Sequence, residues 1–124
     1  MLNILSVFIG GGLGACLRYL TGVLITGNLK IYLPIATFLV NIVGCFLIGF
    51  LYVIFVEKMQ ASKQLKLLLT VGFCGGLTTF STFSAEVFDM IQNGQFFNAS
   101  VYTVLSVIIG CVAVFLGGYC AKLI

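Results

Sequence analysis

The sequence predicts an all-α membrane protein in which one chain of 124 residues crosses the bilayer as four helices. Hydrophobic residues make up 61% of the chain and charged residues only 7%, whereas a soluble domain carries about 25% charged residues. The mean hydropathy is +1.25, and the apolar residues form separate stretches near the ~20 residues that a spanning helix needs. Residues 1–124 are therefore predicted to form a single membrane domain.

The first two helices are separated by residues typical of a loop. The first helix is expected at residues 4–26 and ends at a turn containing Gly, Asn and Lys, residues 27–30. The second is expected at residues 33–56. Pro34 lies in its first turn, where the missing N–H breaks no helical hydrogen bond. The polar stretch at residues 57–66 forms the second loop.

The third helix is expected at residues 65–92, with a break around residues 75–79. Its middle, residues 72–84, reads GFCGGLTTFSTFS and contains three glycines and five hydroxyl side chains. Glycine is a poor helix former, and Ser and Thr offer the backbone competing hydrogen bonds. Irregular backbone at membrane depth is tolerated only where protein or water covers it, so this segment is predicted to line a buried polar site or ion pathway. The fourth helix is expected at residues 98–123.

The scarcity of charged residues excludes several classes of function. Six Lys and Arg stand against three Asp and Glu, and the one basic cluster, residues 58–66, is typical of a solvated loop rather than of nucleic-acid binding. The chain has no histidine, the commonest general base and metal ligand. Its five cysteines form no CxxC pair that would indicate a zinc or disulfide site. We therefore expect neither an enzyme nor a nucleic-acid-binding protein.

The positive charges give a weak orientation signal. Four spans place both termini on one side, with more basic residues there than on the other side. The first group is Lys58, Lys63, Lys66 and Lys122, and the second is Lys30 and Arg18. This asymmetry favours termini in the cytoplasm. Because the bias is small, the chain could insert both ways, and two opposite copies would supply the inverted symmetry found within many transporter chains.

Polar side chains inside the spans are the candidate functional residues. Thr37 and Asn41 are four residues apart and share one face of the second helix. An Asn amide offers two N–H donors, either as a link between helices or as part of a pathway. On the fourth helix, Tyr102 and Ser106 share a stripe with small residues. Close packing explains the small residues, while the two hydroxyls also suit a polar lining.

After the break, the third helix places two phenylalanines on one face. Phe80 and Phe83 are three residues apart, and Ser81 and Thr82 lie between them. Such a pair usually packs in a core or against lipid. Ring edges carry positive partial charge, however, so two rings can face an anion that a full positive charge would hold too tightly. Glu86, one turn further, belongs either in a vestibule or at the membrane interface.

Arg18 and the break itself suggest two further sites. A cation within a span is costly and usually faces water or a partner, so Arg18 either anchors its helix or attracts anions. At the break, carbonyls of the first half-helix lose their intrahelical partners and could coordinate a small cation. The N–H groups of the second half favour negative charge. A metal ion and an anion path can therefore coexist there without an acidic ligand.

These segments together resemble the CrcB/Fluc family of fluoride channels over essentially the whole chain. The resemblance is carried by GGGLGACLRY at residues 10–19, LPIATFLVN at 33–41 with Gly44, and above all GFCGGLTTFSTFS at 72–84. It implies an antiparallel, dual-topology homodimer of four-helix subunits in a bacterial inner membrane, with two pores. Ala36 departs from the family pattern, which usually has glycine before the threonine.

The resemblance also implies roles for individual side chains. Those expected to line the fluoride pathway are Thr37, Asn41, Phe80, Ser81, Thr82, Phe83, Tyr102 and Ser106. Within this set, Asn41 would be the amide donor, and Phe80 and Phe83 would be the rings whose edges contact fluoride. Arg18 and Glu86 would lie in the vestibule.

A sodium ion is the one cofactor that the resemblance implies. It would lie at the centre of the dimer, held by the backbone carbonyls of Gly75 and Thr78 from both subunits. Fluoride, the lipid bilayer and a second copy of the chain are thus the expected partners.

The predicted function is passive export of fluoride. Fluoride is small and strongly hydrated, so a narrow path must replace its water with donors without trapping it. One competing hypothesis is a small multidrug-type proton-coupled exporter, but such proteins carry an embedded Glu on the first helix and this first span has no acid. Another is a membrane-assembly protein without transport, which leaves the cluster of Asn, Phe and hydroxyl residues unexplained.

Overall fold

The computed structural model describes residues 1–28 and 34–124. Four helical stretches are long and apolar enough to cross a membrane: Leu2–Ile25, Ile35–Lys58, Lys63–Gln92 and Phe96–Leu123. The described ranges contain helices and no strand, so the predicted four-span all-α fold is confirmed. The first helix was expected to end at residue 26, but Gly27 and Asn28 of the expected turn still belong to the first helix. The rest of that turn and the expected start of the second helix at residue 33 lie outside the described residues.

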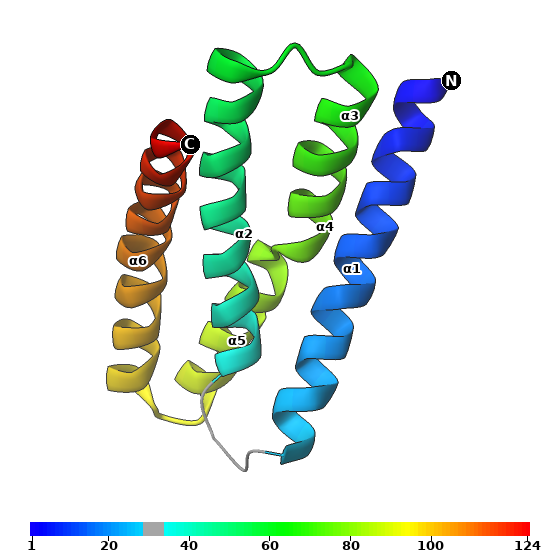
Figure 1. Ribbon diagram of the computed structural model, residues 1–124. Coiled ribbons are helices and arrows are strands. Elements are labelled where there is room, and N and C mark those ends of the chain that lie inside the picture. The colour runs from blue at the N-terminus through cyan, green and yellow to red at the C-terminus, as the bar shows by residue number, and fades with distance from the viewer. Residues whose placement is uncertain (29–33) are drawn as a thin grey trace.

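Two of the spans are continuous α-helices and two are composite. The continuous ones are α1 (Leu2–Asn28) and α6 (Phe96–Leu123). The second span is α2 (Ile35–Val53) followed by a π-helical turn, η1 (Ile54–Lys58). The third consists of α3 (Lys63–Leu67), the π-helical η2 (Leu68–Cys74), α4 (Gly75–Leu77) and α5 (Phe80–Gln92). Both termini lie at the same end of the bundle, as an even number of spans requires (Figure 1).

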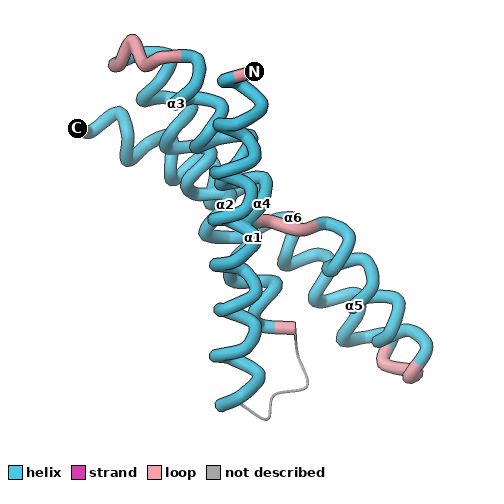
Figure 2. Tube along the Cα trace, turned by 90° about the vertical axis from the view of Figure 1, so that its right-hand side faces the viewer, coloured by secondary structure: helices cyan, strands magenta, loops and turns pink. Residues whose placement is uncertain are grey.

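The third span is interrupted at Thr78 and Thr79. Their backbones are extended, with φ/ψ of −81°/154° and −150°/117°. Residues 75–77 remain helical, so the break is shorter than the predicted 75–79. The reason is local: the N–H and the hydroxyl of Thr78 both donate to the Cys74 carbonyl, at 3.0 and 2.9 Å, and so close the first half-helix. Beyond the break, α5 departs at an angle from the direction of α1 (Figure 2).

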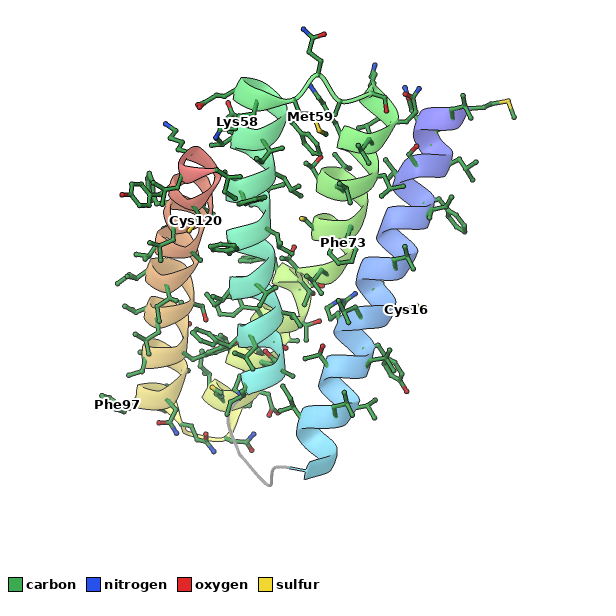
Figure 3. The ribbon with its side chains drawn as sticks, viewed as in Figure 1. Cys16, Lys58, Met59, Phe73, Phe97 and Cys120 are labelled. Atoms are coloured by element: carbon green, nitrogen blue, oxygen red, sulfur yellow. The ribbon has the colours of Figure 1, made fainter. Side chains whose placement is uncertain are left out.

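Glycines allow α1 to approach the first half of the third span closely. A methyl group added at Gly10 or Gly14 would overlap the carbonyl oxygens of Leu68 and Phe73. Phe73 lies on the side of η2 that faces α1 (Figure 3). The GxxxG spacing of α1 is therefore used for backbone packing, as small residues are in many membrane helices.

The α2 and α6 helices lie side by side and are packed in the same way (Figure 1). A methyl group at Gly49 would overlap the Val114 carbonyl, and one at Gly117 would overlap the Phe46 carbonyl. Near the start of α6, a buried cluster of Met90, Ala99 and Tyr102 joins α5 to α6. Close backbone contact thus joins α2 to α6, and side-chain packing joins α5 to α6.

The described lysines gather at the end of the bundle that holds both termini. Lys58, at the upper end of the second span (Figure 3), donates to the Lys122 carbonyl at 3.4 Å. Lys66 donates to the Phe55 carbonyl at 3.1 Å, and the Lys122 ammonium lies 3.9 Å from Glu57. Lys58 and Lys66 thus satisfy carbonyls near helix C-termini. Together with Lys122 they concentrate positive charge at one end of the bundle.

Candidate functional site

The break in the third span is held by side chains from two other helices. Asn41 of α2 accepts a hydrogen bond from the Thr79 N–H at 2.8 Å and donates one to the Thr79 carbonyl at 3.2 Å. Arg18 of α1 donates from Nε to the Gly76 carbonyl at 3.2 Å. Backbone groups that would otherwise be unpaired at membrane depth are satisfied in this way. The Asn41 amide has a second N–H, for which the described residues supply no acceptor.

Hydroxyl groups cluster where α5 begins. The Thr79 hydroxyl accepts from the Thr82 N–H at 3.2 Å and so caps α5, and it donates to the Thr82 hydroxyl at 3.0 Å. The Ser81 hydroxyl lies 3.3 Å from that of Thr79. Thr79 was absent from the predicted pathway residues. Its position directly before a restarted helix, where Thr is a favoured cap, was the signal that could have identified it.

An open groove of about 430 Å³ runs beside the break. Its lining comes from α2, the third span and α6 and includes Asn41, Gly75, Thr78, Thr79, Phe80, Phe83 and Ser106, with no charged side chain. The Ser106 hydroxyl is buried and has no hydrogen-bond partner among the described residues. A buried polar group without a partner costs about 1–3 kcal/mol, so native proteins rarely keep one without a reason.

Three aromatic rings form a row along α5 and α6. The ring centroids of Phe80 and Phe83 are 5.8 Å apart with planes inclined at 38°, and those of Phe83 and Tyr102 are 5.1 Å apart at 53°. Tilted pairs at such distances are favourable because a positive ring edge approaches a negative ring face. Phe83 is half-buried, whereas Phe80 is 80% exposed. Phe83 is thus fixed by packing, while Phe80 lies at the surface of the single chain.

Glu86 links α5 to both α2 and α6. One carboxylate oxygen accepts from the Thr37 hydroxyl at 2.6 Å, and the other accepts from the Tyr102 hydroxyl at 2.9 Å. Hydrogen bonds to a carboxylate are short and roughly twice as strong as neutral ones. Thr37, Tyr102 and Glu86 therefore form a polar cluster of their own, and none of them lines the groove.

Among the described residues, the carbonyl of Gly75 has no hydrogen-bond partner. The last four carbonyls of a helix have no intrahelical partner. Here Thr78 donates to the Cys74 carbonyl, and Arg18 donates to the Gly76 carbonyl. Gly75 is exposed, and a methyl group added to it would meet nothing within 4 Å. In the described part of the chain, no group of three or more His, Cys, Asp and Glu could hold a metal ion. A cation at the break would accordingly meet backbone oxygens.

Comparison with known proteins places this architecture in a family. The family model described as CrcB-like protein, Camphor Resistance (CrcB), matches residues 5–118. The chain belongs to the CrcB family. Its membership confirms the resemblance carried by the glycine-rich and hydroxyl-rich motifs.

Several relatives match this CrcB chain over nearly its whole length. A protein named fluoride-specific ion channel FluC from Gloeothece citriformis is 47% identical over 98% of both chains. A relative with the same name from Bacteroides fragilis is 43% identical, covering 96% of this chain and 95% of its own. Another, from Hydrogenobaculum, is 41% identical, covering 99% of this chain and 100% of its own. Bacterial relatives and four membrane-length helices mark a multi-pass bacterial membrane protein.

The predicted site residues of this CrcB chain fall in distinct places. The groove brings together Asn41, Phe80, Phe83 and Ser106, with Gly75 and Thr78 at the break. Ser81 and Thr82 lie where α5 begins, and Thr37 and Tyr102 meet at Glu86. Arg18 contacts the backbone of the break from the side of α1.

Proposed function

We propose that this CrcB chain forms a fluoride-selective channel in a bacterial inner membrane. It lets fluoride leave the cell passively, down its electrochemical gradient, and so relieves fluoride toxicity. The observation that carries the proposal is the uncharged groove beside the break, which gathers Asn41, Ser106 and two phenyl rings. The full-length relatives named fluoride-specific ion channels support the choice of ion.

The donors in the groove suit a small, strongly hydrated anion. The free N–H of Asn41, the unpartnered Ser106 hydroxyl and the edges of Phe80 and Phe83 can each replace a water molecule around fluoride. None carries a full positive charge, so the ion is not held too tightly to leave. Chloride is larger and would fit the same row of donors poorly.

We propose that two copies assemble as an antiparallel, dual-topology homodimer with two pores. In the single chain the groove is open, Phe80 is 80% exposed, and Gly75 is exposed. Irregular backbone at membrane depth requires cover by protein or water. A second copy of the chain would provide that cover and complete the pathway.

We further propose that a sodium ion lies at the centre of this dimer. The fit rests on the open Gly75 carbonyl and on the extended backbone of Thr78, because carbonyls at broken helices are common sodium ligands. The bound ion would supply a fixed positive charge between the two chains. The carbonyls of Gly75 and Thr78 would orient toward it, while Asn41 and Arg18 hold the backbone on either side.

A flux assay with purified protein tests these proposals. Liposomes containing the protein are loaded with either fluoride or chloride, and release is followed with ion-selective electrodes after potassium ionophore is added. We expect rapid fluoride release and slow chloride release. Equal release of both anions, or release of neither, would overturn the channel proposal. Repeating the assay after sodium is replaced by a large organic cation tests the sodium site, because the proposal requires slower release or loss of the dimer.

A further inference from the structure

Arg18 lies at the negative end of a half-helix in the middle of the chain. Its Nε is 3.2 Å from the Gly76 carbonyl, although the two residues are 58 positions apart. Gly76 belongs to the last turn before the break, where partial negative charge collects on unpaired carbonyls. The side chain is half-buried rather than extended into solvent. Arg18 is therefore placed to hydrogen-bond the end of the half-helix, and it is not a free charge at a pore mouth.

The backbone of α1 fixes this contact. A methyl group at Gly76 would overlap the Gly11 carbonyl, and one at Gly14 would overlap the Phe73 carbonyl. Arg18 is one turn beyond Gly14 and therefore on the same face of α1. The close approach of α1 and α4 therefore places the Arg18 side chain beside the Gly76 carbonyl.

The hydrogen bond from Arg18 decides which oxygens at the break remain open. Thr78 donates to the Cys74 carbonyl, and Arg18 donates to the Gly76 carbonyl. Gly75 lines the groove, and its carbonyl has no hydrogen-bond partner among the described residues. Without the Arg18 donor, the Gly76 carbonyl would be a further open oxygen at membrane depth. The half-helix could then relax by turning that oxygen toward any available donor.

We propose that Arg18 is a positioning residue whose Nε–H, rather than its charge, fixes the end of the first half-helix so that the Gly75 carbonyl faces the groove. The hydrogen bond stands on the structure alone, while its use in presenting a cation site rests on the proposed function. This role differs from anion attraction, which depends on charge and not on the position of one N–H.

Three substitutions separate hydrogen bonding from charge. In Arg18→Gln, the amide nitrogen is attached to Cδ, as Nε is in arginine, so a donor is kept in place and the charge is lost. In Arg18→Lys, the charge is kept and a methylene replaces Nε. In Arg18→Met, neither the charge nor the donor remains. If the Nε–H positions the half-helix, Arg18→Gln should behave like the unsubstituted protein. Arg18→Lys should then behave like Arg18→Met.

Amide hydrogen exchange of the full chain in detergent, read by mass spectrometry over residues 72–84, measures the effect. We expect Arg18→Gln to keep exchange within about two-fold of the unsubstituted protein, and Arg18→Met and Arg18→Lys to accelerate it by about ten-fold or more. A peptide from α6 serves as the internal control for global unfolding. If exchange over residues 72–84 stayed slow in Arg18→Lys but became fast in Arg18→Gln, the charge of Arg18 would be the cause and the proposal would be overturned. Equal exchange in all three variants, whether fast or slow, would overturn it as well.

A sodium titration in the same exchange experiment separates this inference from the proposed function. If Arg18 positions a cation site, sodium slows exchange over residues 72–84 in the unsubstituted protein and in Arg18→Gln, but much less in Arg18→Met. Sodium without effect on the unsubstituted protein would count against the proposed sodium site, and the comparison of variants without sodium would still decide how Arg18 acts.

Discussion

The side chain of Asn41 hydrogen-bonds both backbone groups of Thr79, with 2.8 Å to the N–H nitrogen and 3.2 Å to the carbonyl oxygen. An amide placed this way pairs with the extended residue much as a neighbouring strand would. Asn41 therefore supports the break itself and, in the proposed pathway, has one N–H left to offer to an anion. Asn41 should therefore contribute to both folding and permeation.

Substitution of Asn41 should affect both properties. Asn41→Ala leaves both backbone groups of Thr79 unpaired, and two hydrogen bonds between membrane helices are together worth about 1–3 kcal/mol. We expect the free energy of unfolding in detergent to fall by this amount and fluoride release to fall as well. Asn98→Ala is the matched control, because Asn98 is exposed and makes one long bond, 3.4 Å to Gln95. Unchanged stability in Asn41→Ala would contradict the role in the break.

Glu86 is expected to stabilise the lower part of the bundle. Glu86→Ala removes the acceptor of both Thr37 and Tyr102, which leaves the hydroxyls of two buried residues without their partner. Loss of two bonds to a carboxylate predicts a decrease of about 2–4 kcal/mol in the free energy of unfolding. Asp89→Ala, at an exposed position on the same helix, should change it by less than about 0.5 kcal/mol. Thermal or denaturant unfolding would compare the two, and equal effects would refute the cluster as a stabilising unit.

The two phenylalanines should differ in their effect on stability but not on flux. Both variants lose the ring pair between Phe80 and Phe83, but Phe80 is otherwise 80% exposed. Phe83→Ile also loses the contact with Tyr102, worth about 1 kcal/mol, and should therefore destabilise the protein more. Both should slow fluoride release about ten-fold or more, as a loss of about 1.4 kcal/mol of ion contact would do. Phe88→Ile, 62% exposed on α5, is the control for ring removal alone. Normal release in both Phe80→Ile and Phe83→Ile would exclude the rings from the pathway.

Neighbouring glycines of α1 should respond differently to the same added methyl group. Gly10→Ala places the methyl on the Leu68 carbonyl, whereas at Gly12 nothing lies within 4 Å. We expect Gly10→Ala to lower the free energy of unfolding by about 2 kcal/mol or more, since backbone must move. Gly12→Ala should leave it unchanged or raise it by up to about 1 kcal/mol, because Ala is the better helix former. Comparable destabilisation by both would show that α1 does not pack as described.

Much of the architecture could be predicted because it follows from local composition. Hydropathy located the four spans, and the density of glycine and hydroxyl residues placed the break in the third. The extent of the break was not predictable in the same way. Glycine content suggested 75–79, but capping of Cys74 by Thr78 keeps residues 75–77 helical.

The sequence by itself determined the number of membrane helices, the region of the interruption and the polar residues available at membrane depth, because each depends on residue type and short-range spacing. Only the tertiary structure decided what those residues bind. Asn41 meets a residue 38 positions away and Arg18 one 58 positions away. Such pairings depend on how far each helix is rotated and how closely glycines let the backbones approach. That information resides in packing between helices and not in any one segment.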